Sequence, residues 1–248
     1  MFFVGHISIA FIISYFISRR FQVPSFSLSL VFLLSIIPDI DIIFRLVGVE
    51  VAHRSITHSI IIFTIVCIVL SMFILKHRIR SIIIYFIAYF SHIAIGDIIV
   101  GPSNLLSPFG FFYLNSALYY KMPEHIFVEG LLLITMAIIV VTQYLCYRRG
   151  DIFPIKYSKK LDPIFYPVVV TAIAISAVYL LDGSQLKFPD SFTLLFQSND
   201  YSNIILALNI ACLAAVLAIW IISRRTIRTS HGLFVGIGGP RKMHDKSK

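Results

Sequence analysis

Seven segments of this chain are long and apolar enough to cross a lipid bilayer as helices, and this feature limits the fold most strongly. They are residues 2–18, 26–47, 57–75, 80–100, 126–147, 163–181 and 203–222. A membrane-spanning helix needs about 20 mainly apolar residues. Of the 248 residues, 13% are charged, whereas a soluble domain averages about 25%. We therefore expect an all-α fold, a polytopic helical bundle in the cell membrane.

The basic residues follow alternate apolar segments, which indicates the orientation of the chain. All but four of the 21 Lys and Arg residues lie within residues 19–20, 76–80, 148–160 and 224–248. Cytoplasmic loops of membrane proteins are enriched in Lys and Arg. We therefore expect about seven transmembrane helices, with the N-terminus outside and the C-terminus in the cytoplasm.

Ionisable side chains accumulate in the first five apolar segments, where the bilayer makes them costly and function is the usual reason for them. Counted at about 1.5 Å per residue, they fall between mid-membrane and the outer surface. Seven candidate ligands lie within these segments: His6, Asp39, Asp41, His58, His92, Asp97 and Glu129. His53 and His125 lie at helix mouths and complete a set of nine candidate ligands. The last two apolar segments contain no histidine, aspartate or glutamate. This asymmetry predicts a five-helix core over residues 1–147, a two-helix addition over 148–223 and a basic cytoplasmic tail over 224–248.

Two polar motifs lie at the ends of apolar segments. Pro38 disrupts its helix, because it removes an amide donor and clashes with the preceding turn. The break would let both Asp39 and Asp41 reach one centre, and a helix end capped by two aspartates is the alternative. Residues 53–59 supply two imidazoles, a guanidinium and three hydroxyls at the start of the next segment.

Two further pairs differ in how their spacing suits a shared site. His125 and Glu129 are four residues apart, so they share one face of a helix. His92 and Asp97 are five residues apart, which separates them by about 140° on a regular α-helix. A local distortion near Gly96 would be needed to align them.

Imidazole and carboxylate ligands without thiolate suit Zn²⁺, Mn²⁺ or Fe²⁺, and zinc is the ion we expect. The three cysteines lie in separate apolar runs, so a thiolate cage is not expected. One or two ions are expected, and in a two-ion site Asp97, Asp39 or Asp41 would be the bridging carboxylate. Asp39 or Asp41 would act as the general base, and Arg54 would stabilise charge on a phosphoryl group.

Five short motifs follow one another along the first half of the chain. They are Gly5-His6, Pro38-Asp39-Ile40-Asp41, His53-Arg54-x-x-Thr57-His58-Ser59, Ser91-His92-x-x-x-x-Asp97 and Leu106-Ser107-Pro108-Phe109. In this order they resemble the YdjM-like family of inner-membrane, metal-dependent hydrolases, some of which are regulated by LexA. The resemblance covers residues 1 to about 130. It implies a hydrolase and leaves the substrate open.

The order of the candidate ligands also resembles the zinc-dependent phospholipase C and nuclease superfamily. Its pattern runs histidine, aspartate, histidine, a His-x-x-x-Asp pair, another histidine and a His-x-x-x-Glu pair. Here His92 and Asp97 are one residue further apart, and no histidine lies between Asp97 and His125. The resemblance implies a phosphoester substrate, and the two departures favour a site of one or two ions over three.

We therefore expect a membrane-embedded hydrolase that cleaves a phosphoester of a lipid-like substrate at the outer leaflet through a metal-activated water. The depth of the site and the aromatic loop at 101–125 favour membrane lipid as the partner. The alternatives are an amidase resembling the seven-helix alkaline ceramidases, a metal or proton-coupled transporter, and a haem or structural membrane protein. Transporters often show repeated halves, and this chain shows no repeat. No nucleic-acid partner is expected, and the oligomeric state stays open.

Overall fold

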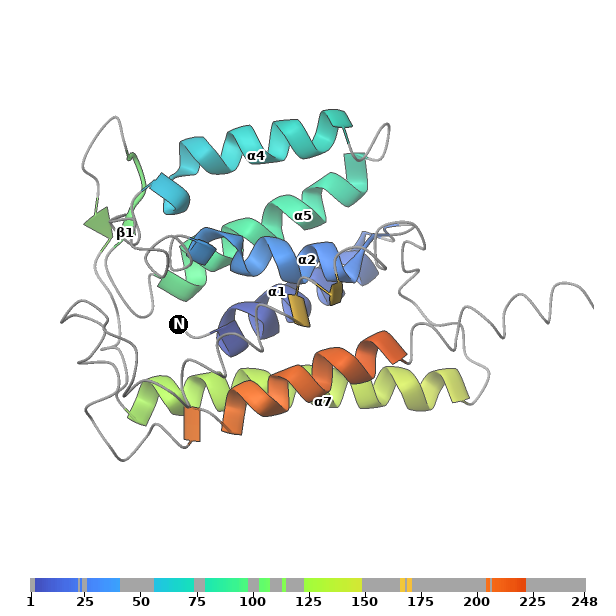
Figure 1. The fold of residues 1–248 in the computed structure, drawn as a ribbon. Helices are drawn as coiled ribbons and strands as arrows, with labels where there is room; N and C mark the ends of the chain where they lie inside the picture. Colours follow the sequence, from blue (N-terminus) through green and yellow to red (C-terminus); the bar gives the residue numbers. More distant parts are fainter. Residues whose placement is uncertain are drawn as a thin grey trace, which may run out of the picture.

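Helices make up almost all of the structure in the computed structural model, which describes residues 3–21, 23, 26–40, 56–73, 79–97, 103–107, 113–114, 123–148, 166–167, 169–170, 204–205 and 207–221. The α-helices are α1 (Phe3–Arg20), α2 (Leu28–Ile36), α4 (Ile60–Phe73), α5 (Ile79–Ser91) and α7 (Pro123–Arg148), together with residues 207–221 (Figure 1). Two 3₁₀ turns, η1 (Ile37–Ile40) and η2 (Ile56–His58), and a π-helix, η3 (His92–Asp97), join or extend them. Two short antiparallel strands, β1 (Ser103–Asn104) and β2 (Tyr113–Leu114), complete the described elements. The expected all-α fold class is confirmed.

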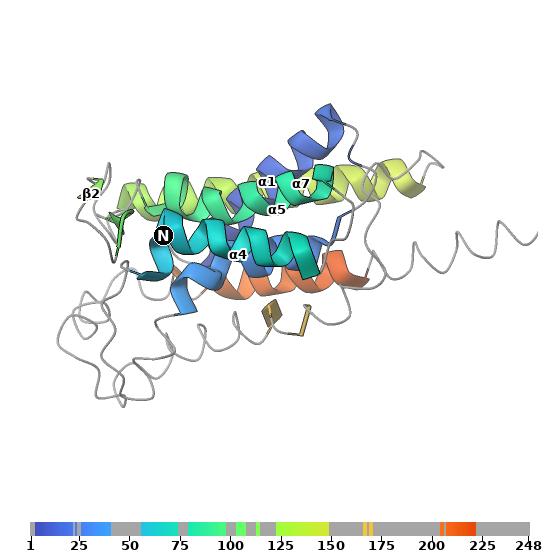
Figure 2. The same ribbon diagram turned by 90° about the horizontal axis from the view of Figure 1, so that it is seen from above.

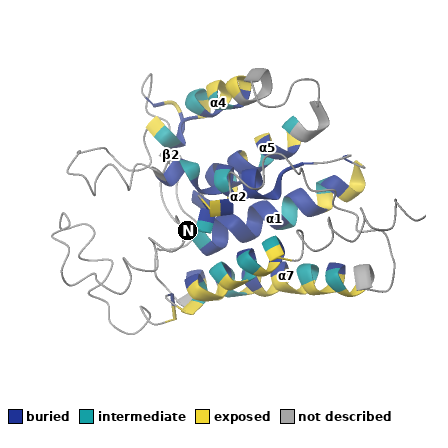
Figure 3. Ribbon diagram, turned by 45° about the vertical axis from the view of Figure 1, so that its right-hand side comes forward, coloured by how far each residue is buried: buried dark blue, intermediate teal, exposed yellow. Residues whose placement is uncertain are grey.

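The first helix occupies the middle of the bundle. It contacts α2, α5 and α7, and α4 packs on the outer side of α5 (Figures 1 and 2). Helix α1 is therefore buried on most of its circumference, as its dark colour in Figure 3 shows. Its apolar side chains Phe11 and Tyr15 join the core, and Phe11 packs against Phe32 of α2. Any polar side chain on the N-terminal half of α1 is thus held inside the protein.

Helix α2 begins and ends at residues that suit those positions. The Ser27 hydroxyl accepts a hydrogen bond from the Leu30 amide at 3.1 Å, which is an N-cap contact. The Ser27 amide itself donates to the Tyr85 hydroxyl of α5 at 2.6 Å. At the other end, Pro38 cannot continue the α-helical hydrogen bonds. The chain tightens there into η1, which carries Asp39.

One of the described helices, Glu124–Leu145 within α7, is long and apolar enough to cross a membrane by length and composition. Shorter apolar helices are Leu28–Asp39, Ile60–Val69, Ile82–Asp97 and Ala207–Ile221. Large apolar side chains are exposed along the outer face of α7 (Figure 3): Phe127, Leu131, Ile134, Ile138, Val141 and Leu145. These helices coincide with predicted spans, whereas only four residues of the segment 163–181 are described. The number of spans and their orientation stay predictions, as does the division into a core, an addition and a tail.

Candidate metal centre

Four side chains from three short elements meet at one end of the bundle. They are Asp39 from η1, His58 from η2, and His92 and Asp97 from the two ends of η3. The His58 Nε2 atom lies 3.2 Å from His92 Nε2, 3.1 Å from Asp97 Oδ2 and 3.4 Å from Asp39 Oδ1. The His92 Nε2 atom lies 3.5 Å from Asp39 Oδ1 and 3.6 Å from Asp97 Oδ2. We call these four residues the His/Asp cluster.

The separations within the cluster suit metal ligands. In a tetrahedral site with metal–ligand bonds of about 2.0–2.2 Å, the ligand atoms lie about 3.3–3.6 Å apart. The five separations given above span 3.1–3.6 Å. Most of them exceed the usual N–H···O distance of about 2.7–3.2 Å. Five of the six separations among these four donor atoms therefore suit ligands of one ion, and His58, His92 and Asp97 alone form a group that could hold one.

The outer nitrogen of each imidazole is held by a neighbouring group. His92 Nδ1 lies 2.6 Å from the Ser35 carbonyl oxygen, so a protonated Nδ1 donates to that carbonyl. His58 Nδ1 lies 3.1 Å from the Thr57 hydroxyl. Histidines that bind metals usually donate their other N–H in this way, which fixes the ring and leaves the facing nitrogen free to coordinate. In the tautomer with Nδ1 protonated, both Nε2 atoms face the centre of the cluster with lone pairs available.

The π-helix explains how His92 and Asp97 reach the same point. Its hydrogen bonds join residues five apart instead of four, which brings residues i and i+5 closer to one face than in an α-helix, and such segments are frequent at functional sites. The predicted distortion near Gly96 is thus present over the whole of His92–Asp97. The Tyr89 hydroxyl, one turn earlier in α5, donates to the Thr57 carbonyl at 2.8 Å and holds η2 beside η3.

The cluster is buried, which limits the charges that it can carry. His58 and His92 are 0% exposed, Asp97 is 1% exposed and Asp39 is 7% exposed. A buried carboxylate is costly unless a cation or hydrogen-bond donors balance it. Two carboxylates and two neutral imidazoles would exactly offset the charge of one divalent ion. The donor set contains nitrogen and oxygen ligands, as Zn²⁺, Mn²⁺ and Fe²⁺ accept, and it does not by itself select among them.

His6 of α1 lies against the cluster. Its ring stacks on the His92 ring with centroids 3.6 Å apart and planes inclined by 12°. Its Nε2 atom is 3.9 Å from Asp39 Oδ2. His6, Asp39 and His92 form a second group that could hold a metal ion. Five of the nine predicted ligands are therefore brought together: His6, Asp39, His58, His92 and Asp97.

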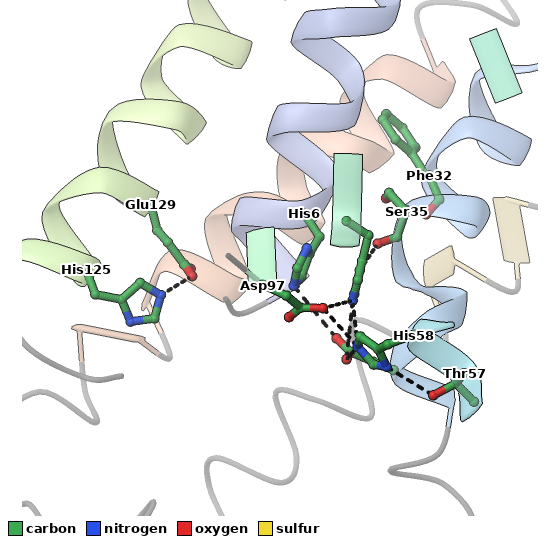
Figure 4. Close-up of polar contacts among 10 residues, drawn as sticks. His6, Phe32, Ser35, Thr57, His58, Asp97, His125 and Glu129 are labelled. Atoms are coloured by element: carbon green, nitrogen blue, oxygen red, sulfur yellow. Dashed lines mark hydrogen bonds and ion pairs between the residues drawn. The ribbon is translucent and has the colours of Figure 1, made fainter. Parts of the chain in front are cut away.

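Two further predicted ligands, His125 and Glu129, lie apart from the cluster (Figure 4). His125 and Glu129 face each other on α7, with His125 Nε2 and Glu129 Oε1 2.8 Å apart, and both are buried. Figure 4 shows this pair apart from the His/Asp cluster, and neither residue belongs to the two metal-binding groups of the described residues. The predicted roles of Asp41, His53 and Arg54 fall outside the described residues.

Two supporting groups were not predicted from the sequence. The Ser35 carbonyl is a backbone atom, so its residue type carries no signal for this role. Tyr89 precedes His92 by three residues in an apolar helix. A hydroxyl one turn before a candidate ligand is a signal that could have identified it.

Comparisons with known proteins place the chain in a family. No curated protein and no solved structure matches the chain. The family model described as YdjM inner membrane protein matches residues 1–227. This match extends well beyond the first 130 residues, where the motifs of the sequence resemblance end. The chain therefore belongs to the YdjM inner membrane protein family.

Proposed function

We propose that this protein is a membrane-embedded metal-dependent hydrolase that cleaves a phosphoester of a lipid-like substrate. The observation that carries the proposal is the set of 3.1–3.6 Å separations among buried donor atoms of His58, His92, Asp39 and Asp97. Four ligands of this kind would hold a divalent ion. Such an ion, when bound, polarises a phosphoryl oxygen and activates water near neutral pH.

The residues of the chain have distinct roles in this proposal. Ser35 and Thr57 orient the two imidazoles through their Nδ1 atoms. Asp39 lies within 3.5 Å of both imidazole Nε2 atoms, so its position supports a role as ligand more than as general base. The general base would then be supplied by another carboxylate, for which Asp41 stays the candidate. Arg54 stays the candidate for stabilising the phosphoryl charge.

Exposed apolar side chains next to the cluster support a lipid-like substrate. Ile56 and Ile60 flank His58 in the chain and are 47% and 36% exposed. Ile95 lies within η3. Leu106 follows Leu105, whose carbonyl accepts a hydrogen bond from the Ile60 amide. Both are exposed as well. An acyl chain approaching the ligands would contact these side chains, whereas a fully polar substrate would leave their apolar surface exposed to water.

A hydrolysis screen tests the proposal. Purified protein supplied with Zn²⁺ is incubated with phospholipid vesicles, with ceramide and with a soluble phosphodiester, and products are identified by mass spectrometry. We expect phospholipid cleavage that chelation abolishes. His92→Ala should reduce the rate to that of the chelated protein, whereas His231→Ala, in the basic tail, should leave it unchanged.

The same screen, together with a metal-transport assay in vesicles that contain the protein, separates the alternatives. Cleavage of ceramide without cleavage of phosphoesters would replace the phosphoesterase with an amidase. Transport of metal ions across vesicles that contain the protein, without cleavage of any substrate, would contradict the hydrolase proposal.

A further inference from the structure

Asp39 presents its two carboxylate oxygens to different imidazoles. Its Oδ1 atom lies 3.4 Å from His58 Nε2 and 3.5 Å from His92 Nε2. Its Oδ2 atom lies 3.9 Å from His6 Nε2. Two ligands of one ion with bonds of about 2.1 Å are at most about 4.2 Å apart, so both oxygens are within range of a shared ion with the imidazole each one faces. The carboxylate thus stands between two sets of nitrogen donors.

His6 lacks the contacts that a buried structural histidine normally has. The residue is 1% exposed, and neither ring nitrogen has a hydrogen-bond partner among the described residues. A buried polar group without a hydrogen bond costs free energy. A metal bond to Nε2 would satisfy the nitrogen that faces Asp39.

The backbone around His6 is shaped to receive its ring. A Cβ atom added at Gly96 would collide with His6 Cε1 and Nδ1, and it would lie 3.5 Å from Nε2. The Nδ1 edge of the ring therefore rests against η3, while Nε2 is the atom farther from it. The stacking on His92 holds the ring in the same place.

We propose that the centre binds two divalent ions, with Asp39 as the bridging carboxylate. The first ion is held by His58, His92, Asp97 and Asp39 Oδ1, and the second by His6 Nε2 and Asp39 Oδ2. The second ion has fewer protein ligands, so more of its coordination positions are open to substrate or water. Paired ions of this kind lie about 3.5–4 Å apart and stabilise both the attacking and the leaving oxygen in phosphoester cleavage. The inference rests on the proposed metal centre and adds the number of ions and the bridge.

Metal content and spin coupling test this inference without relying on activity. The detergent-purified full chain is reconstituted with Zn²⁺ or with Mn²⁺, freed of loose metal, and analysed by elemental mass spectrometry. We expect two ions per chain in the native protein and one in His6→Gln. Ser8→Ala, which removes a buried hydroxyl from the same helix, is the matched control and should retain two.

Paramagnetic resonance of the native Mn²⁺ protein needs no variant. Two ions bridged by Asp39 should give an exchange-coupled spectrum, and His6→Gln should give the spectrum of an isolated ion. One ion per chain in the native protein, or two ions in His6→Gln, would overturn the second site. The first site would then still stand, because it fails only if the native protein binds no metal or if His92→Ala retains all of it. The proposed function is tested separately, by the hydrolysis screen.

Discussion

The Nδ1 atom of His92 lies 2.6 Å from the carbonyl oxygen of Ser35, and this contact joins η3 to the end of α2. The last four carbonyls of an α-helix have no partner within the helix. Because α2 ends at Ile36, the Ser35 carbonyl is one of them, and His92 provides its donor. The same helix end leads into η1 with Asp39. One contact therefore orients an imidazole and also places it beside a carboxylate.

Removing the hydroxyl beside His58 should weaken metal binding. Thr57→Val deletes the group 3.1 Å from His58 Nδ1. Loss of such a supporting partner typically lowers metal affinity by about 10–100-fold, and we expect an effect of this size in a competition titration with a chelator. Thr64→Val is the control, because the Thr64 hydroxyl donates a hydrogen bond to the Ile60 carbonyl of its own helix. Equal affinities for the two variants would refute an orienting role for Thr57.

A methyl group at Gly96 should displace His6. We expect Gly96→Ala to destabilise the protein by about 1–3 kcal/mol through overpacking, as measured by thermal unfolding in detergent. Gly130→Ala is the matched control, because a Cβ there meets nothing within 4 Å. Alanine favours a helix over glycine by about 0.8–1 kcal/mol, so that change should be neutral or stabilising.

A double-mutant cycle identifies the cause of the Gly96 effect. In a His6→Ala background the ring that the new methyl group meets is gone, so Gly96→Ala should cost much less. An undiminished cost in that background would show that the π-helix itself, and not the His6 ring, rejects the methyl group.

Two tyrosines of α5 should differ in their effect on metal binding. Tyr89→Phe removes the 2.8 Å hydrogen bond to the Thr57 carbonyl, which holds η2 with His58. Tyr85→Phe removes the 2.6 Å bond from the Ser27 amide, at the far end of α2. Each should lower the free energy of unfolding by about 1 kcal/mol. Only Tyr89→Phe should also lower metal affinity, and a loss of affinity in both would argue that the effect is general destabilisation.

Cysteine labelling tests the predicted orientation of the chain. In a background with Cys67, Cys146 and Cys212 replaced, a membrane-impermeant thiol reagent should label Ser103→Cys in intact cells. Ser158→Cys should react only after the cells are permeabilised, since it lies in a basic segment that is predicted to be cytoplasmic. Labelling of Ser158→Cys from outside would refute the predicted topology.

The sequence was sufficient to predict the helical fold class and most of the cluster. Spacing and polarity in apolar segments identified His58, His92 and Asp97, and the proline at position 38 located the break that carries Asp39. The predicted distortion at Gly96 is a full π-helix, which a spacing of five residues suggests but does not specify. These features are local, so the sequence encodes them directly.

Other features depend on how the helices are rotated about their axes. A predicted depth gives the height of a residue along the bundle and leaves its direction undetermined. His6 and Glu129 were both predicted between mid-membrane and the outer surface, yet only His6 lies against the cluster, because α1 is central and α7 contacts it from the other side (Figure 1). The Ser35 carbonyl was equally inaccessible to sequence reasoning, since any residue type provides one.

X-ray absorption at the metal edge of the purified, zinc-loaded protein tests the central claim most directly. We expect nitrogen and oxygen ligands at about 2.0–2.2 Å, outer-shell scattering from imidazole rings and no sulfur near 2.3 Å. The imidazole scattering should fall in His92→Ala and stay unchanged in His231→Ala. A protein that retains no zinc, manganese or iron, or a spectrum with sulfur ligands, would contradict the assignment of a metal centre to His58, His92, Asp97 and Asp39.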